Sequence, residues 1–453
     1  MISVNPHRPS DVVAEFAPTP PAGVGEAVER AAAAQPGWAA RPAAARGAAL
    51  AAAADELESR TAEVTGLMVR EVGKPVAEAG GEVGRAVAVL RYYAQQVLSA
   101  DGETYPASDG RSWLVVRRRP LGVCGLVTPW NFPVALPAWK AAPALAWGNT
   151  VVLKPAPQST ALGLLLGDLL ARHVAPGCCE VVIGDGEQGR ALVEHERVAA
   201  LSFTGSSAVG RQVAAAAAGR GARVQCEMGG LNPSVVLADA DLDAAAAVIA
   251  GAAMGYAGQK CTATSRVIVD HAVADRFRPL LVRAIEALGV GDPAAADTVV
   301  GPVIDEPARD AALEAIGRAG GRRLTGEQDP PPDGYYVRPT LVELDDTDSV
   351  LAREEVFAPV AAFLVADGPD DALRLANDVR YGLSGAVFTR DLRRALEFMQ
   401  GMEAGLVRVN AATSGVDFHA PFGGIKDSSY GPREQGLAAR DFFTETQTLL
   451  VTP

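Results

Sequence analysis

Apolar residues in the first hundred positions recur with the spacing of amphipathic helices. The pattern runs through Leu57, Val64 and Met68 and resumes at Val83 and Leu90. Residues three, four or seven positions apart share one face of a helix, so this spacing predicts a stripe of buried side chains. We therefore expect an all-helical opening from about residue 25 to residue 100.

The period of the pattern shortens after residue 112, where short β-branched runs begin to alternate with helical stretches. Alternation of this kind is typical of a parallel sheet covered by helices on both faces. The predicted strands lie at 112–119, 121–127, 150–153, 180–183, 199–203 and 223–227. The predicted helices lie at 161–172, 188–193 and 208–218.

A second alternating series follows Pro233 and predicts a second α/β domain. Its strands are expected at 234–237, 266–269, 361–365, 386–388 and 407–409. The apolar stretch 244–258 is rich in alanine and glycine and is shorter than the roughly 18 residues that a membrane span needs, so we interpret it as a buried helix. The proline-rich stretch 326–333 is expected to be a surface loop.

Composition narrows the class of protein. With 453 residues, of which 49% are hydrophobic and 21% charged, the chain is long enough for two or three domains. The net charge of −13 has no basic block, which argues against nucleic-acid binding. The five cysteines are sparse and lack metal-type spacing, and no signal peptide is visible, so we expect reduced thiols and a cytoplasmic protein without a metal site.

One cysteine, Cys261, lies among small and polar residues directly before the apolar run 267–269. This position predicts a thiol on a loop that leads into a strand. A nucleophilic cysteine needs access and thiolate character, and such a loop can provide both. The alternative is a buried, inert thiol.

Two glycine-containing turns are candidates for binding a phosphate. Residues 184–189 fit G-x-G-x-x-G after a strand, with Gly186 as the second glycine, although a purely structural strand-to-helix turn has the same pattern. The turn at Gly205 and Ser206 ends another strand and opens a helix, where free amides can hold a pyrophosphate. Lys154, at the end of the strand 150–153, either reaches a ribose or phosphate or is a solvated strand-end lysine.

Several segments in a fixed order, from near the start of the first sheet to near the end of the chain, resemble the aldehyde dehydrogenase superfamily. The segments are Pro129–Pro133, Gly148–Pro155, Phe203–Gly210, Glu227–Gly230, Gly258–Arg266, Glu354–Val360 and Pro421–Gly424. The resemblance implies a Rossmann-like cofactor domain at 1–104 and 120–228, a catalytic α/β domain at 229–427, and a small β oligomerisation arm at 105–119 and 428–453. It also implies a homodimer or a dimer of dimers.

The resemblance assigns roles to individual positions. The nucleophile falls on Cys261, the general base on Glu227 and the oxyanion-binding amide on Asn131. The cofactor would contact Lys154 and Glu355 at the ribose and the Gly205–Ser206 turn at the pyrophosphate, with Trp130 and Phe357 nearby. An aldehyde substrate would lie between Phe132, Tyr256, Thr262 and the loop that ends at His419.

These residue types suit the oxidation of an aldehyde. A cysteine thiolate can add to the aldehyde carbon, and an uncharged amide with the backbone N–H of Cys261 can hold the resulting oxyanion. Hydride transfer to the nicotinamide leaves a thioester, and a glutamate of raised pKa such as Glu227 can activate the water that hydrolyses it. A CoA-acylating enzyme generally lacks this base, and a catalytically inactive relative would not need these residues.

Finer motifs bear on the substrate and the cofactor. The runs 261–266, 415–424 and 428–436 resemble the α-ketoglutaric semialdehyde dehydrogenase branch, which implies an aldehyde that carries a carboxylate. At five positions, the chain has a residue that differs from the usual one in the wider family. These residues are Leu231, Tyr256, Ala358, Arg408 and Ser429. Pro157 stands where many NAD-preferring members have a glutamate that binds the ribose hydroxyls, so we expect NADP to be favoured over NAD.

Overall fold

The computed structural model describes residues 1–326 and 331–453, so the predicted loop 326–333 lies partly outside the described residues. Its helical opening is confirmed as α1 (Pro21–Ala39), α2 (Ala43–Ser59), α3 (Thr61–Val72) and α4 (Val76–Gln96). An unpredicted hairpin of β1 (Ile2–Asn5) and β2 (Arg8–Glu15) precedes them, and it packs against α3.

The first sheet has the strand order β19-β9-β8-β5-β6-β7, and all its pairs are parallel except β19 with β9. The chain enters at β5, builds outward through β6 and β7, and then returns to the other side of β5 with β8 and β9. The point where the strand order reverses, between β5 and β8, opens a crevice at the carboxyl ends of the strands. The strands are β5 (Val123–Thr128), β6 (Thr150–Pro155), β7 (Cys179–Val181), β8 (Val198–Thr204), β9 (Arg223–Glu227) and β19 (Ser429–Tyr430).

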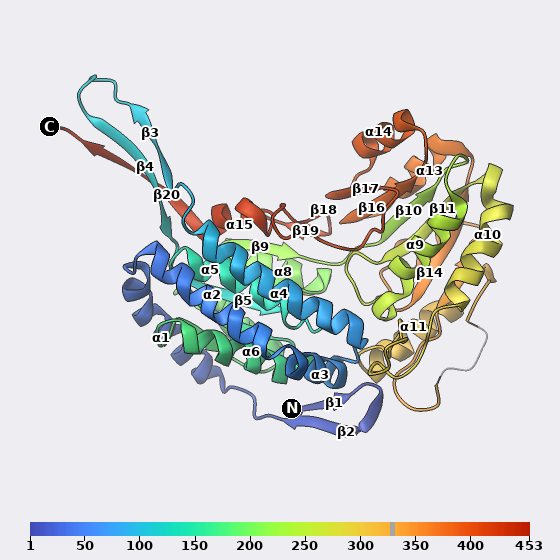
Figure 1. The fold of residues 1–453 in the computed structure, drawn as a ribbon, viewed down its shortest axis with the longest axis horizontal. Helices are drawn as coiled ribbons and strands as arrows, with labels where there is room; N and C mark the ends of the chain where they lie inside the picture. The colour runs from blue at the N-terminus through green and yellow to red at the C-terminus, as the bar shows by residue number, and fades with distance from the viewer. Residues whose placement is uncertain (327–330) are drawn as a thin grey trace.

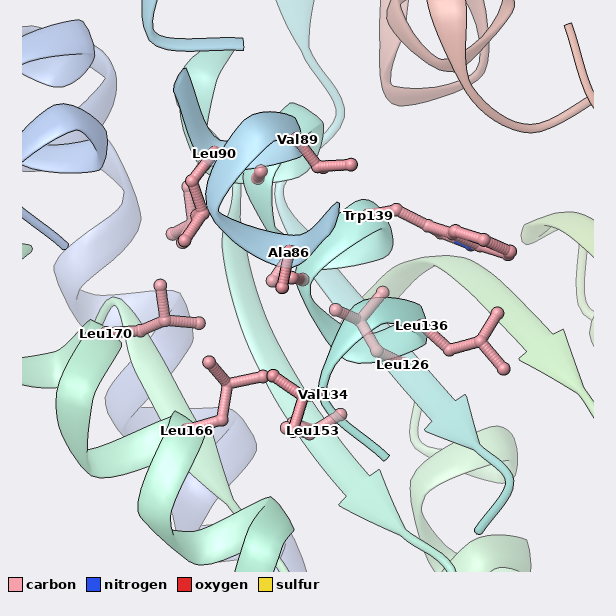
Figure 2. Packing of buried hydrophobic residues seen from close by; sticks show 14 of the residues in the cluster. Ala86, Val89, Leu90, Leu126, Val134, Leu136, Trp139, Leu153, Leu166 and Leu170 are labelled. Carbon is pink, nitrogen blue, oxygen red and sulfur yellow. The ribbon is translucent and has the colours of Figure 1, made fainter. Parts of the chain in front are cut away.

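Helices cover both faces of this sheet, as the alternating pattern predicts. They are α5 (Ala135–Ala146), α6 (Thr160–His173), α7 (Gly186–Glu194) and α8 (Ser207–Gly219). Figure 2 shows Leu126 and Leu153 of the sheet gathered around Val134, the residue before α5, with Leu166 of α6 alongside. Each fully buried leucine contributes about 1.5 to 3 kcal/mol, so this core fixes the loops that leave β5 and β6.

The second sheet has the order β12-β13-β14-β11-β10-β16-β17 and is parallel except at its β12 edge. Helices α9 (Leu242–Met254) and α10 (His271–Glu286) pack with it, so the stretch 244–258 is largely a buried helix as predicted. Among the described residues, no helix is long and apolar enough to cross a membrane. The strands are β10 (Asn232–Val236), β11 (Thr264–Asp270), β12 (Arg322–Arg323), β13 (Thr340–Glu343), β14 (Val360–Ala366), β16 (Ser384–Phe388) and β17 (Leu406–Val409).

A three-stranded antiparallel arm projects away from both sheets and carries the C-terminus (Figure 1). It consists of β3 (Gly102–Pro106), β4 (Trp113–Pro120) and β20 (Thr444–Val451). The side chains of Trp113 and Leu450 are 76% and 62% exposed on it. The range 428–453 expected for the arm also contains β19, in the first sheet, and α15 (Gly436–Phe443), which contacts α5.

The carboxyl ends of the strands in the first large sheet face the amino ends of the strands in the second. The loops after β5 and β9 leave the carboxyl ends of the first sheet, whereas the loops before β10, β11 and β14 enter the amino ends of the second. Asn131, after β5, donates a hydrogen bond from Nδ2 to the carbonyl of Gln259, before β11, at 2.9 Å. The candidate site therefore lies between the sheets.

Candidate active site

A turn with a strained backbone precedes Cys261 and places it in the cleft between the two sheets. Tyr256, Ala257 and Gly258 all adopt left-handed backbone conformations, with φ of 52°, 52° and 67°. The left-handed conformation costs about 1 to 3 kcal/mol at each non-glycine residue, and it persists only where the surrounding packing enforces it. A Cβ atom on Gly258 would lie 2.1 Å from the carbonyl oxygen of Ala358, so glycine is required here.

The thiol of Cys261 differs in accessibility from the other cysteines of the chain. Cys261 is half-buried, whereas the remaining four are buried. Burial, together with the negative charges of Glu355 and Glu227, raises the pKa of Cys261 to about 12. The loop position is confirmed, but the expected thiolate character is not, because burial first, and then the charges of Glu355 and Glu227, favour the neutral thiol. Attack on a substrate therefore requires removal of the thiol proton.

Asn131 is held by a buried ion pair that we did not expect from the sequence. Lys74 donates to the carbonyl oxygen of Asn131 at 2.6 Å and to the carboxylate of Glu82. Glu82 also accepts the backbone N–H groups of Val134 and Ala135 at 2.8 and 2.9 Å. The pair thus fixes the middle and the end of the loop between β5 and α5, and the oxyanion role of Asn131 stays a prediction.

Glu227 is the last residue of β9, and its side chain is buried. Burial, followed by the negative charge of Glu434, raises its pKa well above the ordinary value. Ser429 donates to Glu227 Oε2 at 2.7 Å and accepts the N–H of Gly424 at 2.6 Å. Glu227 Oε1 has no hydrogen-bond partner among the described residues. One oxygen is therefore anchored and the other is available for a water molecule.

Glu434 belongs to a buried polar network behind Glu227. Lys140 donates to Glu434 and, at 2.8 Å, to the hydroxyl of Ser202. Trp139 donates from its indole nitrogen to the other oxygen of Glu434 at 2.8 Å. Glu434 is 1% exposed, so its charge acts on Glu227 with little screening by water.

Lys154, at the carboxyl end of β6, lies next to the glycine turn that contains Gly186. Lys154 donates to the carbonyl of Gly184 at 2.8 Å, and burial lowers its pKa to about 8. Gly186 begins α7, whose N-terminus is capped by the side chain of Asp185 through a hydrogen bond from the amide of Glu187. The glycine turn therefore fixes the side chain of Lys154 through the carbonyl of Gly184.

The turn at Gly205 and Ser206 lies beside the crevice between β5 and β8. A Cβ atom on Gly205 would lie 2.6 Å from the ring of Phe203, so the turn requires glycine. The hydroxyls of Thr128 and Thr204, at the carboxyl ends of β5 and β8, are buried without partners among the described residues. Free hydroxyls beside the N-terminus of α8 fit a dinucleotide phosphate.

The other residues predicted to contact the cofactor, Glu355 at the ribose and Trp130 and Phe357 near the pyrophosphate, come from segments of both sheets. Glu355 accepts the N–H of Gly230 at 3.0 Å, and burial raises the pKa of Glu355 to about 7. Trp130 and Phe357 form an edge-to-face ring contact with centroids 5.7 Å apart. Phe357 has a φ of 55°, so this contact depends on a second strained position.

The four predicted substrate residues have different surroundings. Phe132 is half-buried, Thr262 is buried and His419 is exposed next to the ring of Phe418. Tyr256 is completely buried, and Lys74 Nζ lies 4.3 Å from its ring centroid. Its burial favours a packing role behind Phe132, whose ring centroid is 6.4 Å away. Its contact with substrate stays a prediction.

Among the described residues, no group of three or more histidine, cysteine, aspartate or glutamate side chains could hold a metal ion.

Comparison with known proteins agrees with this geometry. Residues 1–449 match the sequence model of the Aldehyde dehydrogenase family. The chain is 40% identical over 460 residues to alpha-ketoglutaric semialdehyde dehydrogenase of Bacillus subtilis (strain 168), which covers 99% of this chain and 94% of that protein. It is 40% identical over 455 residues to alpha-ketoglutarate semialdehyde dehydrogenase of Haloferax volcanii, with 98% and 94% covered. The crystal structure of NAD-dependent aldehyde dehydrogenase from Sinorhizobium meliloti has a TM-score of 0.96 at 32% identity, with 100% and 91% covered.

The chain therefore belongs to the aldehyde dehydrogenase family. It is an NAD(P)-dependent oxidoreductase that acts on aldehydes. The fold class and the activity predicted from the sequence are confirmed.

Proposed function

We propose that the protein oxidises an oxo-acid semialdehyde to a dicarboxylate through a thioester on Cys261. The observation that carries this proposal is the convergence of Cys261, Asn131 and Glu227 between the two sheets. The resemblance of the whole chain to alpha-ketoglutaric semialdehyde dehydrogenases supports the substrate class.

Each residue has a distinct part in the proposed reaction. Cys261 loses its proton and attacks the aldehyde carbon, and the Nδ2 amide of Asn131 with the N–H of Cys261 stabilises the oxyanion. Lys154, Glu355 and the Gly205–Ser206 turn would hold NAD(P), which would supply the hydride acceptor. Glu227 then takes a proton from water, which attacks the thioester and releases the acid. This hydrolytic role for Glu227 favours water over CoA as the acceptor.

The substrate class can be tested by steady-state kinetics with purified protein. We expect a higher kcat/KM for α-ketoglutaric semialdehyde than for hexanal and benzaldehyde, measured by the absorbance of the reduced cofactor. Equal or lower efficiency with the semialdehyde would contradict the substrate class, although any cofactor reduction would still support aldehyde oxidation.

We propose that NADP is preferred and that Lys154 provides the preference. Pro157, which begins a short 3₁₀ helix at Pro157–Ser159, offers no carboxylate to the ribose, so nothing at that position repels a 2′-phosphate. Because the pKa of Lys154 is lowered to about 8, the lysine is charged below that pH and loses its proton above it. The ratio of kcat/KM for NADP to that for NAD should therefore fall as pH rises from 7 to 9.

Measuring that ratio at several pH values, with Pro157→Glu for comparison, checks this prediction. The variant should shift the preference toward NAD, because its carboxylate can accept hydrogen bonds from the ribose hydroxyls. A wild-type preference for NAD of more than about tenfold, or 1.4 kcal/mol, would show that Pro157 does not set the choice.

We further propose that the arm of β3, β4 and β20 joins two subunits into a homodimer or a dimer of dimers. Strands β3 and β20 both have free edges within the described chain, and the arm exposes Trp113, Leu450 and Val451. Unpaired edges and exposed apolar side chains are stabilised by a partner. Light scattering at micromolar concentration should give at least twice the 46.8 kDa of one chain, and a monomer would contradict the proposal.

A further inference from the structure

Two arginines converge on the loop from Thr413 to His419, which borders the cleft. Arg85 donates from Nη1 to the carbonyl of Val416, and Arg408 donates from Nη2 to the carbonyl of Gly415. Both side chains are half-buried, and neither forms an ion pair with any residue that the structure describes. The loop thus brings together two guanidinium groups from distant segments.

Arg408 lies on the side of β17 that faces the cleft. Successive residues of a strand point to opposite faces. Val407 and Val409 pack against the core of the second sheet, whereas Leu406 packs against the core of the first, as Cys261 and Val416 also do. Arg408, two residues after Leu406, shares its face. The Nε atom of Arg408 is buried and has no hydrogen-bond acceptor among the described residues.

Arg85 lies on the same side of α4 as residues that border the cleft. It is three residues after Glu82, which binds the loop of Asn131, and four before Val89, so these side chains are neighbours on the helix. Figure 2 shows Val89 on the same side of the core as Trp139, whose indole binds Glu434. The loop residue Val416 packs with this cluster too.

Two lysines near the aldehyde site have carboxylate partners. Lys74 is paired with Glu82, and Lys260, next to the nucleophile, is paired with Glu78 at 2.9 Å. Asp417, in the loop itself, lies within ion-pair distance of neither arginine. The positive charges of Arg85 and Arg408 are therefore uncompensated at this edge of the site.

We propose that Arg85 and Arg408 bind the distal carboxylate of the substrate, which selects aldehydes that carry an acid group at the far end. This assignment rests on the proposed function and names the residues responsible for its substrate class. A guanidinium can form paired hydrogen bonds with a carboxylate, and each arginine uses one donor on the loop and keeps others free. The aldehyde group lies at Cys261 and the carboxylate lies beneath the loop.

The test compares acid and neutral aldehydes of equal length in four proteins: wild type, Arg85→Gln, Arg408→Gln and Arg91→Gln. Arg91 is also half-buried on α4, but it is paired with Asp55 and Glu58, so it is a matched control. The measured quantity is the ratio of kcat/KM for succinic semialdehyde to that for butanal. We expect at least a tenfold fall in this ratio for Arg85→Gln and Arg408→Gln, partial recovery with Arg→Lys at the same positions, and no change for Arg91→Gln.

A ratio within twofold of wild type in both folded variants would overturn the assignment, as would a wild-type ratio near one. No cofactor reduction with any aldehyde would instead contradict the proposed function. If a variant does not fold, inhibition of butanal oxidation by pentanoate and by pentanamide is measured in the wild type. Competitive inhibition at least tenfold stronger with pentanoate supports the carboxylate site, and equal inhibition overturns it.

Discussion

Replacing Cys261 by alanine should abolish formation of the reduced cofactor, with a loss of more than about 1,000-fold in kcat, because no other group can form the thioester. The other four cysteines are buried and cannot substitute for it. Cofactor binding should persist, because Lys154 and the Gly205–Ser206 turn are untouched. Absorbance assays and fluorescence titration with NADPH or NADH check the two expectations.

Cys226→Ala is the matched control for this variant, because Cys226 is buried in β9 next to Glu227 and its thiol donates to the carbonyl of Gly210, away from the proposed chemistry. It should retain turnover, with at most a loss of stability. Turnover like that of the wild type in Cys261→Ala would refute the role of Cys261.

Replacing Glu227 by glutamine should leave a rapid first turnover and slow every later one. Acylation of Cys261 and hydride transfer precede the step that needs a base, so reduced cofactor should form in a burst of about one equivalent per site. Steady-state turnover should fall by about 100-fold or more, the usual contribution of a general base. Stopped-flow absorbance separates the two phases. A slow first turnover without a burst would assign Glu227 to deprotonation of the thiol.

Ser429→Ala should affect the same step as Glu227→Gln, but less strongly. The hydrogen bond from Ser429 favours the charged form of Glu227, so its loss should raise the pKa of Glu227 further. Deacylation should then need a higher pH, with activity recovered under alkaline conditions. A loss of activity that is independent of pH would indicate that Ser429 has only a structural role.

The alternation of strands and helices could be predicted because burial imposes a period on each element. The predicted strand 266–269 corresponds to β11, and the helix 161–172 corresponds to α6. The hairpin of β1 and β2 was missed because β2 is half-buried on one face and exposed on the other, so its sequence RPSDVVAE lacks an apolar run.

The electrostatics of the site could not be read from the sequence. Cys261 has small and polar neighbours along the chain, which suggested a low pKa, but burial and the charges of Glu355 and Glu227, from other segments, raise it. Lys74 and Glu82 resemble solvated charges near the start of a helix, yet they are buried and hold the loop of Asn131. Such pairs depend on tertiary contacts between segments of the chain, and no local pattern predicts them.

The most direct test of the account is the mass of the Glu227→Gln protein quenched in acid within the first turnover with aldehyde and oxidised cofactor. We expect an acyl adduct on the peptide that contains Cys261, in an amount equal to the reduced cofactor formed. Reduced cofactor without an adduct on that peptide, or an adduct on another residue, would contradict oxidation through a thioester on Cys261.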